Sequence, residues 1–534
     1  MLTNLNVKTK FRIDSKITSS VMEIIQDVLK NPVKVPNYLN SEYNKKINND
    51  SELIGYDKSI KQISPFNKNY HVCEYNYVDS KGIKNYFENY KSNRKLWEEA
   101  SFSERRDVFM KAADLIVKKY FDKMLAYTIV GQNKTIYEAE IDAICELADF
   151  LRFNVKYAEM IHEKQPLQTK NHVNISEYNS LNGFVASITP FNFTAIAANL
   201  ASAPLLFGNS VLWKPSDSAI LSNHLFYEIM HEAGLPEGVL NFCPMEPDNF
   251  VNSIVEQKEF AGLLFTGSSK VFTDINKKII NNLDKYKNFP RISGETGGKN
   301  FHLINSFKKE ENHDFKYLEY IVDRTIESSC NFSGQKCSAG SIVYVPKNIL
   351  ETFIDIFKSN LDRYLDKTEN YGVINEDTFT RLKNKIKQLK EDDKIDFVIE
   401  GKITDEDSYF IHPHVLICED HSHEVFNEEY FGPILAIYPY DDEDIDNLMD
   451  LCCDSNSYAL TGSIFSKDES LIRQASKKFK HKTGNFYIND KSTGAVVGQQ
   501  PFGGSGKSGT NDKAGDINLL YKLFNQRNIK ISHD

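Results

Sequence analysis

The sequence predicts an α/β protein with two α/β domains and a small appendage, and three observations support this fold class. A chain of 534 residues is long enough for two or three domains. Short apolar runs of strand length alternate with stretches whose apolar residues recur at helical spacing, which predicts βαβ units and a parallel sheet. This alternation occurs twice, over about residues 183–266 and again over about residues 301–486.

The N-terminal part of the chain departs from this pattern. Its first ~90 residues are rich in Lys, Asn, Ser and Tyr, and they predict an irregular lead-in with one helix near residues 20–29. Helical spacing then predicts helices over residues 103–120 and 135–157. The apolar stripe of the second helix contains Ile141, Ile144, Cys145, Ala148, Leu151 and Val155.

The two alternating series supply the strands of the predicted sheets. In the first series we expect strands at residues 184–188, 211–213, 239–242 and 262–265. Helices are expected up to residue 206 and over residues 220–233. The second series includes strands at residues 341–345 and 435–438, and after Gly494 the chain is glycine-rich and then polar.

Composition excludes several function classes. The hydrophobic fraction of 41% and the charged fraction of 26% are ordinary for a globular protein. A net charge of −10 argues against a nucleic-acid partner, because phosphate binding needs clustered positive charge. The chain contains no run of ~18 apolar residues, so we expect no membrane span.

The start of the chain and its cysteines bear on the compartment. Lys8, Lys10 and Arg12 precede no apolar segment, so secretion is not expected, although a weak mitochondrial presequence fits. The eight cysteines are scattered, which favours a reducing compartment and predicts neither a zinc site nor a disulfide scaffold.

One cysteine, Cys337, lies in a loop of small residues, 331–340 (NFSGQKCSAG). Small residues let the backbone approach a ligand, and Lys336 favours the thiolate if its ammonium points toward the sulfur. Taken alone, an isolated cysteine is more often a packing residue, as we expect for Cys330.

A carboxylate stands on a tight backbone at residues 291–300 (RISGETGGKN). Glycines on both sides of Glu295 suit a base that must swing toward a water molecule, and an exposed turn acid is an equal alternative. Further upstream, Gly267 and Ser268 join a strand to a helix, where backbone N–H groups can hold pyrophosphate.

The combination of motifs is far more specific than any one of them. Seven occur in order: residues 189–192 (TPFN), 213–217 (WKPSD), 265–268 (FTGS), 294–298 (GETGG), 334–337 (GQKC), 428–433 (EEYFGP) and 501–504 (PFGG). From about residue 60 to its C-terminus, the chain resembles the aldehyde dehydrogenase superfamily. The resemblance implies a Rossmann-like NAD-binding domain, an α/β catalytic domain and a small β oligomerisation appendage.

The resemblance also implies a catalytic mechanism. Cys337 would attack the aldehyde as a thiolate, and the side-chain amide of Asn192 with the Cys337 backbone N–H would stabilise the oxyanion. Hydride transfer to NAD would leave a thioester, which water activated by Glu295 would hydrolyse.

Cofactor contacts follow from the same resemblance. Lys214 and Asp217 match contacts to the adenosine ribose, and Asp217 predicts NAD over NADP because a carboxylate repels a 2′-phosphate. Glu429 matches the contact to the nicotinamide ribose. The remaining expected cofactor residues are Thr189, Gly267, Ser268 and Phe431.

Longer motifs narrow the substrate. Residues 187–196, 489–504 and 509–513, with residues 139–143 and 152–154, are similar to the subfamily that oxidises L-glutamate γ-semialdehyde, formed from Δ1-pyrroline-5-carboxylate, to L-glutamate in the second step of proline catabolism. The Ser492 hydroxyl and the backbone N–H groups of Gly494 and Ala495 would then hold the α-carboxylate. Phe193, Ser338 and Phe502 are the other expected substrate contacts.

Several alternatives stay open. Glu146 aligns with a pocket-side acid of the subfamily, yet the apolar stripe places it on the polar face of its helix, where a solvated acid is equally expected. Another NAD-dependent semialdehyde dehydrogenase, a cysteine hydrolase or acyltransferase without a redox step, and a catalytically silent binding protein are the competing functions.

The resemblance gives domain limits and assembly. We expect an NAD-binding domain over residues 1–300, a catalytic domain over residues 301–495, and a return to the NAD-binding domain over residues 496–534. A hairpin within residues 160–180 and the C-terminal tail would form a homodimer or a larger homo-oligomer. The compartment would be the mitochondrial matrix in a eukaryote and the cytoplasm in a bacterium.

Overall fold

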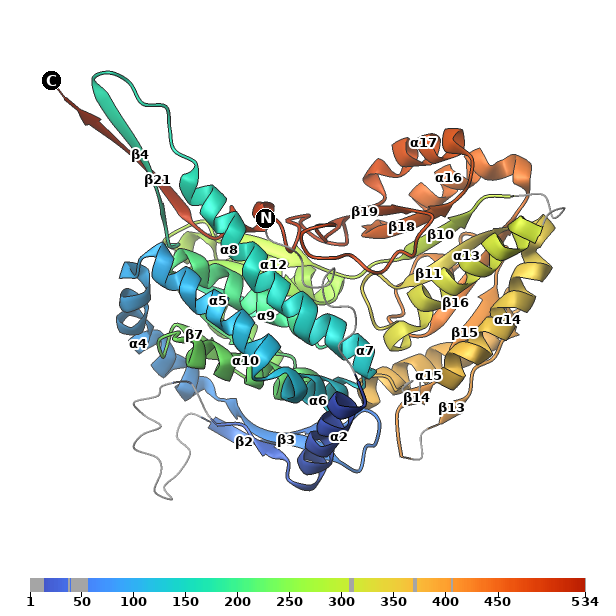
Figure 1. Cartoon of the computed structure of the whole chain (residues 1–534), viewed down its shortest axis with the longest axis horizontal. Helices are drawn as coiled ribbons and strands as arrows, with labels where there is room; N and C mark the ends of the chain where they lie inside the picture. The colour runs from blue at the N-terminus through green and yellow to red at the C-terminus, as the bar shows by residue number, and fades with distance from the viewer. Residues whose placement is uncertain are drawn as a thin grey trace.

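The computed structural model describes residues 14–36, 39, 56–306, 312–367, 372–404 and 407–533. Two α/β halves lie side by side, and a two-stranded ribbon projects from one of them (Figure 1). The basic opening with Lys8, Lys10 and Arg12 lies outside the described residues.

The first half contains a five-stranded parallel sheet in the order β7-β6-β5-β8-β9. Its strands are β5 (Phe184–Ile188), β6 (Ser210–Lys214), β7 (Leu240–Phe242), β8 (Phe260–Thr266) and β9 (Arg291–Glu295). The connecting helices are α9 (Thr194–Ser202), α10 (Ile220–Ala233), α11 (Pro247–Val255) and α12 (Ser269–Ile280). Strands β6 and β8 are buried along their whole length, as expected for a parallel sheet covered on both faces. The predicted strands and helices of the first series are therefore confirmed.

The second half contains a seven-stranded sheet in the order β12-β15-β16-β11-β10-β18-β19, in which only the edge strand β12 runs antiparallel. Its strands are β10 (Asn300–Ile304), β11 (Gly340–Pro346), β12 (Asp396–Ile399), β15 (His414–Ile417), β16 (Ile434–Tyr440), β18 (Thr461–Phe465) and β19 (Asn485–Ile488). Its helices are α13 (Asn312–Cys330), α14 (Leu350–Lys367), α15 (Glu376–Lys390), α16 (Ile445–Asp454) and α17 (Glu469–Lys478). The short strand pairs are β13 (Ile403–Thr404) with β14 (Phe410–Ile411), and β17 (Tyr458–Ala459) with β20 (Ser505–Gly506).

The prediction of an irregular lead-in was wrong over residues 56–99. After α2 (Ser15–Lys30), the structure has a three-stranded sheet of β1 (Val33–Lys34), β2 (Tyr56–Ile63) and β3 (His71–Val78), followed by helix α4 (Ser80–Glu99). The apolar side chains of α4 are mostly aromatic, and tertiary contacts hold them: Tyr86 and Tyr90 are buried, and the Trp97 indole N–H donates to the Leu205 carbonyl at 2.9 Å. Such contacts override local composition.

A helical layer covers the first sheet and contains α5 (Phe102–Lys118), α6 (Phe121–Gln132), α7 (Ile136–Ala139) and α8 (Leu147–Glu163) (Figure 1). Between α7 and α8 the chain forms a π-helix, Glu140–Glu146. A π-helical turn contains an extra residue, so it rotates the residues on its two sides relative to each other. This rotation explains why Ile141, expected in the apolar stripe, is 46% exposed while Ile144, Cys145, Ala148, Leu151 and Val155 are buried.

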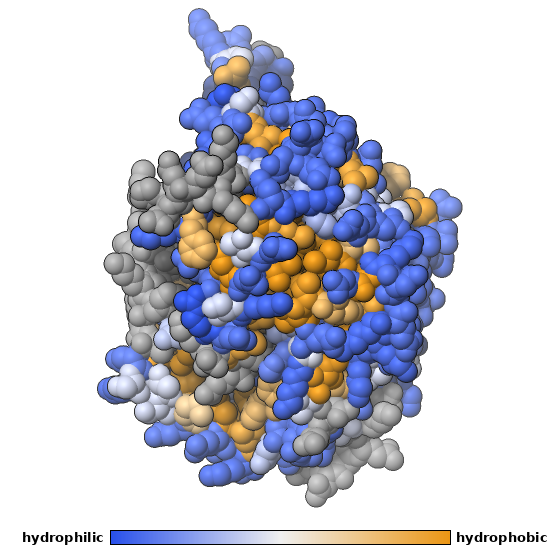
Figure 2. Space-filling view, turned by 90° about the vertical axis from the view of Figure 1, so that its right-hand side faces the viewer, coloured by the Kyte–Doolittle hydropathy of each residue, from blue (hydrophilic) through white to orange (hydrophobic). Residues whose placement is uncertain are grey.

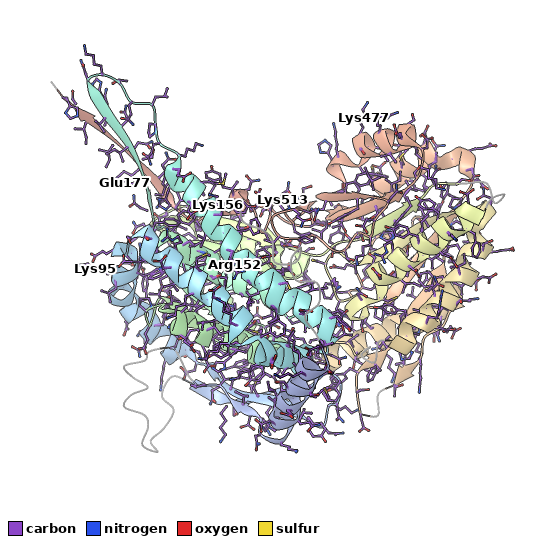
Figure 3. The ribbon with its side chains drawn as sticks, viewed as in Figure 1. Lys95, Arg152, Lys156, Glu177, Lys477 and Lys513 are labelled. Carbon is purple, nitrogen blue, oxygen red and sulfur yellow. The ribbon has the colours of Figure 1, made fainter. Side chains whose placement is uncertain are left out.

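After β19 the chain returns to the first half. Gly509 pairs with Glu295 at the end of β9, and the short helix α18 (Ile517–Leu520) leads into β21 (Asn525–Ser532). Strand β21 pairs antiparallel with β4 (His172–Asn179) to form the projecting ribbon. Arg527 and Glu177, the latter marked in Figure 3, form an ion pair across it. In the part of the chain that the structure describes, no helix has the length and apolarity that a membrane crossing requires.

Candidate active site

A cavity of about 160 Å³ lies where the two halves meet, and Cys337 and Glu295 both line it. Glu295 ends β9 of the first half, whereas Cys337 lies in the loop between α13 and β11 of the second half. The distance between Cys337 Sγ and Glu295 Oε1 is 3.6 Å, which permits a thiol–carboxylate hydrogen bond. The predicted nucleophile and the predicted base are therefore neighbours in space.

A strained backbone turn places Cys337. Phe332 and Ser333 both have a φ of 52°, in the left-handed region, and Gly334 follows with a φ of 68°. A side chain at position 334 would overlap the backbone of Gly432. The turn thus needs glycine at position 334, and such strain is common where a chain holds a reactive group in place.

The backbone around Glu295 is equally restricted. A side chain at Gly294 would overlap the Phe272 ring. The Gly294 N–H donates to Thr510 Oγ1 at 3.0 Å, and the Thr510 N–H donates to the Gly294 carbonyl at 2.8 Å. The returning C-terminal segment therefore clamps the end of the strand that carries the base.

Burial sets the protonation states of this pair. Burial first, and then the charges of Glu295 and Glu429, raise the pKa of the Cys337 thiol well above its ordinary value. Burial also raises the pKa of Glu295 to about 7, against the opposing effects of the Cys337 hydrogen bond and the charge of Lys513. Lys513 lies where the two halves meet (Figure 3). At neutral pH the carboxylate is therefore the group that can take the thiol proton.

Lys336 would favour the thiolate if its ammonium pointed toward the sulfur, but the largest causes acting on the pKa of Cys337 are burial and the charges of Glu295 and Glu429, and they raise it. Burial lowers the pKa of Lys336 to about 8, and the acids whose charges oppose this shift are Glu138 and Glu146. Lys336 lines the cavity together with these two acids.

Asn192, the predicted oxyanion donor, is buried beside the nucleophile loop. It lies two residues before α9, and its Nδ2 donates to the carbonyl of Gln335 at 3.1 Å. Gln335 is two residues before Cys337, so one N–H of the amide anchors the loop that carries the nucleophile. The amide's second N–H is a further donor.

The expected cofactor residues of the first half lie at one edge of its sheet. Thr189 follows β5, Lys214 ends β6, and Gly267 and Ser268 follow β8. These are the carboxyl ends of parallel strands, where open α/β sheets bind their ligands. The Ser268 hydroxyl caps α12 by accepting from the Val271 N–H at 3.3 Å.

Asp217 follows this edge in a short 3-10 turn. The Tyr75 hydroxyl donates to Asp217 Oδ1 at 3.1 Å, and Tyr77 also hydrogen-bonds the carboxylate. Strand β3, which the sequence did not predict, thus fixes the acid that we expect to select the cofactor.

The second half brings Glu429 and Phe431 toward the same edge. Glu429 Oε1 accepts from the Gly298 N–H at 2.8 Å, and a side chain at Gly297 would overlap the carboxylate. The Phe431 ring lies 6.0 Å from that of Phe191, edge to face. Gly297 and Gly298, which follow Glu295, therefore leave space for the Glu429 carboxylate of the second half.

Five of the six expected substrate residues line the cavity: Phe193, Ser338, Gly494, Ala495 and Phe502. Ser492 does not, which corrects its predicted contact with the substrate. Its side chain is fully buried, donates to the Ser338 carbonyl at 3.1 Å and lies 2.8 Å from Ser328 Oγ. Because this hydroxyl donates its only proton to the Ser338 carbonyl, it has no proton left to donate to a substrate carboxylate.

The structure decides between the two positions expected for Glu146, on the cavity side or on a solvated face of its helix, which here is a π-helix. Glu146 ends this helix, and it lines the cavity rather than a solvated helix face. Burial raises its pKa to about 8, assisted by the charge of Asp142. Residues 142–145 and 147–151 are all buried, so this stretch of helix has no solvated face on which the acid could lie.

Sequence reasoning missed much of the cavity wall. The additional lining residues include charged, polar and aromatic side chains: Lys134, Glu138, Phe150, Phe332, Lys491 and Thr493. The Lys134 ammonium lies 4.2 Å from the Phe193 ring centroid and 5.0 Å from that of Phe332. Lys491 and Thr493, which flank Ser492, line the cavity although Ser492 itself does not. Lys134 gave no signal in the sequence.

Comparison with known proteins agrees with this geometry. The model of the aldehyde dehydrogenase family matches residues 54–529. A Schizosaccharomyces pombe protein named probable delta-1-pyrroline-5-carboxylate dehydrogenase is 42% identical over 484 residues, covering 88% of this chain and 86% of that protein. The human mitochondrial delta-1-pyrroline-5-carboxylate dehydrogenase is 39% identical over 479 residues, covering 88% and 84%.

A solved structure extends the similarity to the whole fold. The crystal structure of the Mycobacterium tuberculosis delta-pyrroline-5-carboxylate dehydrogenase bound with NAD has a TM-score of 0.89 and 31% sequence identity, and the match covers 100% of this chain and 97% of that one. The ordered motifs, the Cys337–Glu295 pair and these matches together show that the chain belongs to the aldehyde dehydrogenase family.

Proposed function

We propose that this protein oxidises L-glutamate γ-semialdehyde, the open form of Δ1-pyrroline-5-carboxylate, to L-glutamate with NAD as the oxidant. The observation that carries the proposal is the Cys337–Glu295 pair, 3.6 Å apart in a cavity that also contains Lys134, Glu138, Glu146, Lys336 and Lys491. A thiol beside a base suits acyl chemistry on an aldehyde, and a charged wall suits a substrate with an amino-acid end. The names of the relatives supply the identity of that substrate.

Each catalytic residue then has a defined task, and Glu295 has two. Glu295 takes the proton of Cys337, and the sulfur bonds to the aldehyde carbon to give a thiohemiacetal whose oxyanion the amide of Asn192 stabilises. When bound, NAD accepts the hydride that leaves this carbon. Glu295 releases its first proton to solvent and, as a carboxylate again, takes a proton from the water that attacks the thioester on Cys337. The C–S bond breaks, the acid leaves, and Glu295 returns this second proton to the sulfur, which restores the thiol.

The residues at the carboxyl edge of the first sheet fit a dinucleotide. The N-terminus of the twelve-residue helix α12, with Ser268 at its cap, suits a pyrophosphate. The buried Thr266 hydroxyl beside it has no hydrogen-bond partner among the described residues. Lys214 and Asp217 would hold the adenosine ribose, and Glu429 would hold the nicotinamide ribose. Thr189, Gly267 and Phe431 would complete the site.

The substrate's α-carboxylate would rest on the loop after β19. With Ser492 occupied elsewhere, the donors are the backbone N–H groups of Gly494 and Ala495. Gly494 has a φ of +107°, a conformation that favours glycine and turns the backbone of this loop. Phe193 and Phe502 would cover the aliphatic chain between the two ends, with Ser338 beside the reacting carbon.

In this proposal the NAD-binding domain spans residues 1–300, the catalytic domain spans residues 301–495, and residues 496–534 return to the first domain. The returning segment and residues 160–180 supply the ribbon. Its exposed apolar side chains, Val173, Ile175 and Ile531, are 38%, 36% and 43% exposed, and Leu167 before it is 90% exposed.

A second copy of the chain is the occupant that we propose for the ribbon. Two-stranded ribbons are marginally stable alone, so a homodimer or a larger homo-oligomer would cover these side chains. Figure 2 shows apolar residues gathered in the middle of the face opposite the ribbon, framed by hydrophilic ones.

The compartment would be the mitochondrial matrix in a eukaryote and the cytoplasm in a bacterium.

The test is a comparison of aldehydes in an assay of NADH formation at 340 nm. We expect kcat/KM for Δ1-pyrroline-5-carboxylate to exceed that for succinate semialdehyde by at least about a hundredfold, because succinate semialdehyde lacks the α-amino group. Equal values would contradict the proposed substrate. No NADH formation from either aldehyde would instead favour a hydrolase or an acyltransferase.

A further inference from the structure

A chain of buried hydrogen bonds connects the loop that carries Cys337 to the loop that lines the substrate cavity after β19. We call these the nucleophile loop (residues 335–340) and the substrate loop (residues 490–497). Ser492 of the substrate loop donates through Oγ to the Ser338 carbonyl at 3.1 Å. Its backbone N–H donates to His302 Nε2 at 3.2 Å. His302 and Ser492 are both fully buried, so water does not compete for these bonds.

The donor and the acceptor of each hydrogen bond in this series can be assigned, starting from the Thr325 hydroxyl at one end and the Ser492 N–H at the other. Thr325 uses its only proton to donate to the Ile321 carbonyl at 2.8 Å, so at 3.0 Å it accepts from His302 Nδ1. The Nε2 atom of His302 accepts from the Ser492 N–H, which fixes a neutral imidazole with its proton on Nδ1. Burial, which lowers the pKa of His302 to about 3, maintains the neutral form.

The serine hydroxyls are ordered in the same way. Ser492 gives its proton to the Ser338 carbonyl, so at 2.8 Å it accepts from Ser328 Oγ. Ser328 in turn accepts from the Gly340 N–H at 3.1 Å. Each proton is therefore used once, and the nucleophile loop is held at Ser338 and at Gly340.

The two loops do not depend equally on this series of hydrogen bonds. The nucleophile loop has a separate tether, because Asn300 Nδ2 donates to the carbonyls of Cys337 at 2.7 Å and of Ala339 at 2.8 Å. The substrate loop reaches the nucleophile loop through the Ser492 hydroxyl. Removing that hydroxyl should therefore leave Cys337 in place and break the direct link between the two loops, while the Ser492 N–H bond to His302 and the bond of Lys491 Nζ to Glu327 at 2.8 Å still hold the substrate loop to the second half.

We infer that Ser492 is a positioning residue that fixes the distance between the substrate loop and Cys337, and thereby selects the length of the aldehyde. This inference rests on the proposed function, because it requires that Gly494 and Ala495 hold the carboxyl end of the substrate. A substrate held at one end reacts only if its aldehyde carbon reaches the sulfur, and a misplacement of about 1 Å can cost a hundredfold in rate. An aldehyde without a carboxylate does not use the loop.

The experiment compares two aldehydes, Δ1-pyrroline-5-carboxylate and propanal, on the full-length enzyme. For Ser492→Ala we expect kcat/KM with Δ1-pyrroline-5-carboxylate to fall about ten- to a hundredfold, while that with propanal changes less than about threefold. For Asn300→Ala, which frees the Cys337 carbonyl, we expect both values to fall alike. Equal losses for the two aldehydes in Ser492→Ala, or no loss with either, would overturn the inference.

A matched control is available in the neighbouring strand. Ser463 pairs with His302 in the sheet register, is fully buried, and its hydroxyl has no hydrogen-bond partner among the described residues. Ser463→Ala should leave both aldehydes unaffected, which separates the loss of this particular hydroxyl from the loss of any buried serine. The rate of Cys337 alkylation by iodoacetamide should be unchanged in Ser492→Ala; a change of tenfold or more would show that the nucleophile itself has moved.

A second pair of variants keeps the test decisive if Ser492→Ala does not fold. His302→Gln retains an acceptor for the Ser492 N–H, whereas His302→Leu does not. We expect the ratio of kcat/KM between the two aldehydes to be near wild type in His302→Gln and to fall about tenfold in His302→Leu. The same ratio in both variants would overturn the inference. A wild-type enzyme that turns over propanal but not Δ1-pyrroline-5-carboxylate would instead contradict the proposed function.

Discussion

At the scale of single residues, protonation decides when Cys337 can react. The Cys337 thiol is buried and lies near Glu295 and Glu429, so its resting form is the neutral thiol. The pKa of Glu295, raised by burial to about 7, makes this carboxylate the nearby base that changes charge near neutral pH. In the proposed mechanism the same group serves twice, first on the thiol and later on water.

This pair predicts a pH dependence. Below its pKa Glu295 is protonated and cannot take the proton of Cys337, so kcat/KM should rise about tenfold per pH unit up to about pH 7 and level off above it. The measurement is the pH profile of NADH formation from about pH 5.5 to about pH 8.5, a range that brackets the pKa of Glu295.

Burial also raises the pKa of Glu429 to about 7, so the profile alone does not identify the group. Glu295→Gln should remove the rising limb, and Glu429→Gln should keep it at lower overall activity. A rising limb that survives in Glu295→Gln would show that Glu295 is not the base.

Cofactor choice is a second property of one residue. Asp217 is held by the hydroxyl groups of Tyr75 and Tyr77, so its carboxylate has a fixed place after β6. We expect Asp217→Ala to raise the NADP-to-NAD ratio of kcat/KM by about tenfold, because a repulsion of about 1.4 kcal/mol is removed. Asp274→Ala, which removes an exposed acid from α12, is the control and should leave the ratio unchanged. A wild-type preference for NADP would contradict this role.

At the scale of elements, the parallel strands could be predicted and the N-terminal sheet could not. Strands β5, β6 and β8 are continuous apolar runs because both faces of their sheet are covered, and that pattern is visible in the sequence. Strand β3 and helix α4 use tyrosines and polar side chains whose partners lie far along the chain, such as Tyr75 with Asp217. The π-helix before α8 could not be predicted from the sequence either, and Glu146 at its end lines the cavity.

The π-helix also carries an acid that caps another helix. Asp142 accepts through its two carboxylate oxygens from the N–H groups of Thr194 at 3.0 Å and Ala195 at 2.9 Å, at the start of α9. Its Oδ2 also lies 2.6 Å from Lys134 Nζ, and both side chains are 1% exposed. Asp142 therefore ties the cavity wall to the helix that follows Asn192 and Phe193.

Removing this acid should destabilise the protein strongly. We expect Asp142→Ala to cost about 3–5 kcal/mol, because the Lys134 ammonium stays buried without that carboxylate. The readout is the midpoint of thermal unfolding. Asp114→Ala is the control: Asp114 is 49% exposed in its pair with Arg152, marked in Figure 3, and should cost less than about 1 kcal/mol. Equal shifts in the two midpoints would contradict the capping role.

At the scale of the whole molecule, the site forms where two halves of the chain meet. The end of β9 and the loops that follow β5, β19 and α13 each contribute side chains, and the distances between these side chains cannot be read from the sequence. Ordered motifs identified Cys337, Glu295 and Asn192 before any geometry was known. The partners of Ser492 could not be predicted, because His302 and Ser328 come from a strand and a helix that no motif marks.

The ribbon of β4 and β21 gives a prediction at the same scale. We expect the wild-type protein to be a dimer or larger in sedimentation experiments. The double variant Val173→Lys, Ile175→Lys should shift it toward the monomer, because two charges would replace apolar side chains on the ribbon. Leu451→Lys, at a site of similar exposure on α16, is the control. A monomeric wild type would contradict this role of the ribbon.

The central claim is that Cys337 forms a covalent bond with the substrate, and the chain offers a matched control in Cys330, which is also buried. The most direct measurement is NADH formation from Δ1-pyrroline-5-carboxylate in Cys337→Ala and in Cys330→Ala. We expect the first variant to lose activity by at least about ten-thousandfold, as removal of a nucleophile does, and the second to keep most of it. Activity that survives in Cys337→Ala would contradict the account.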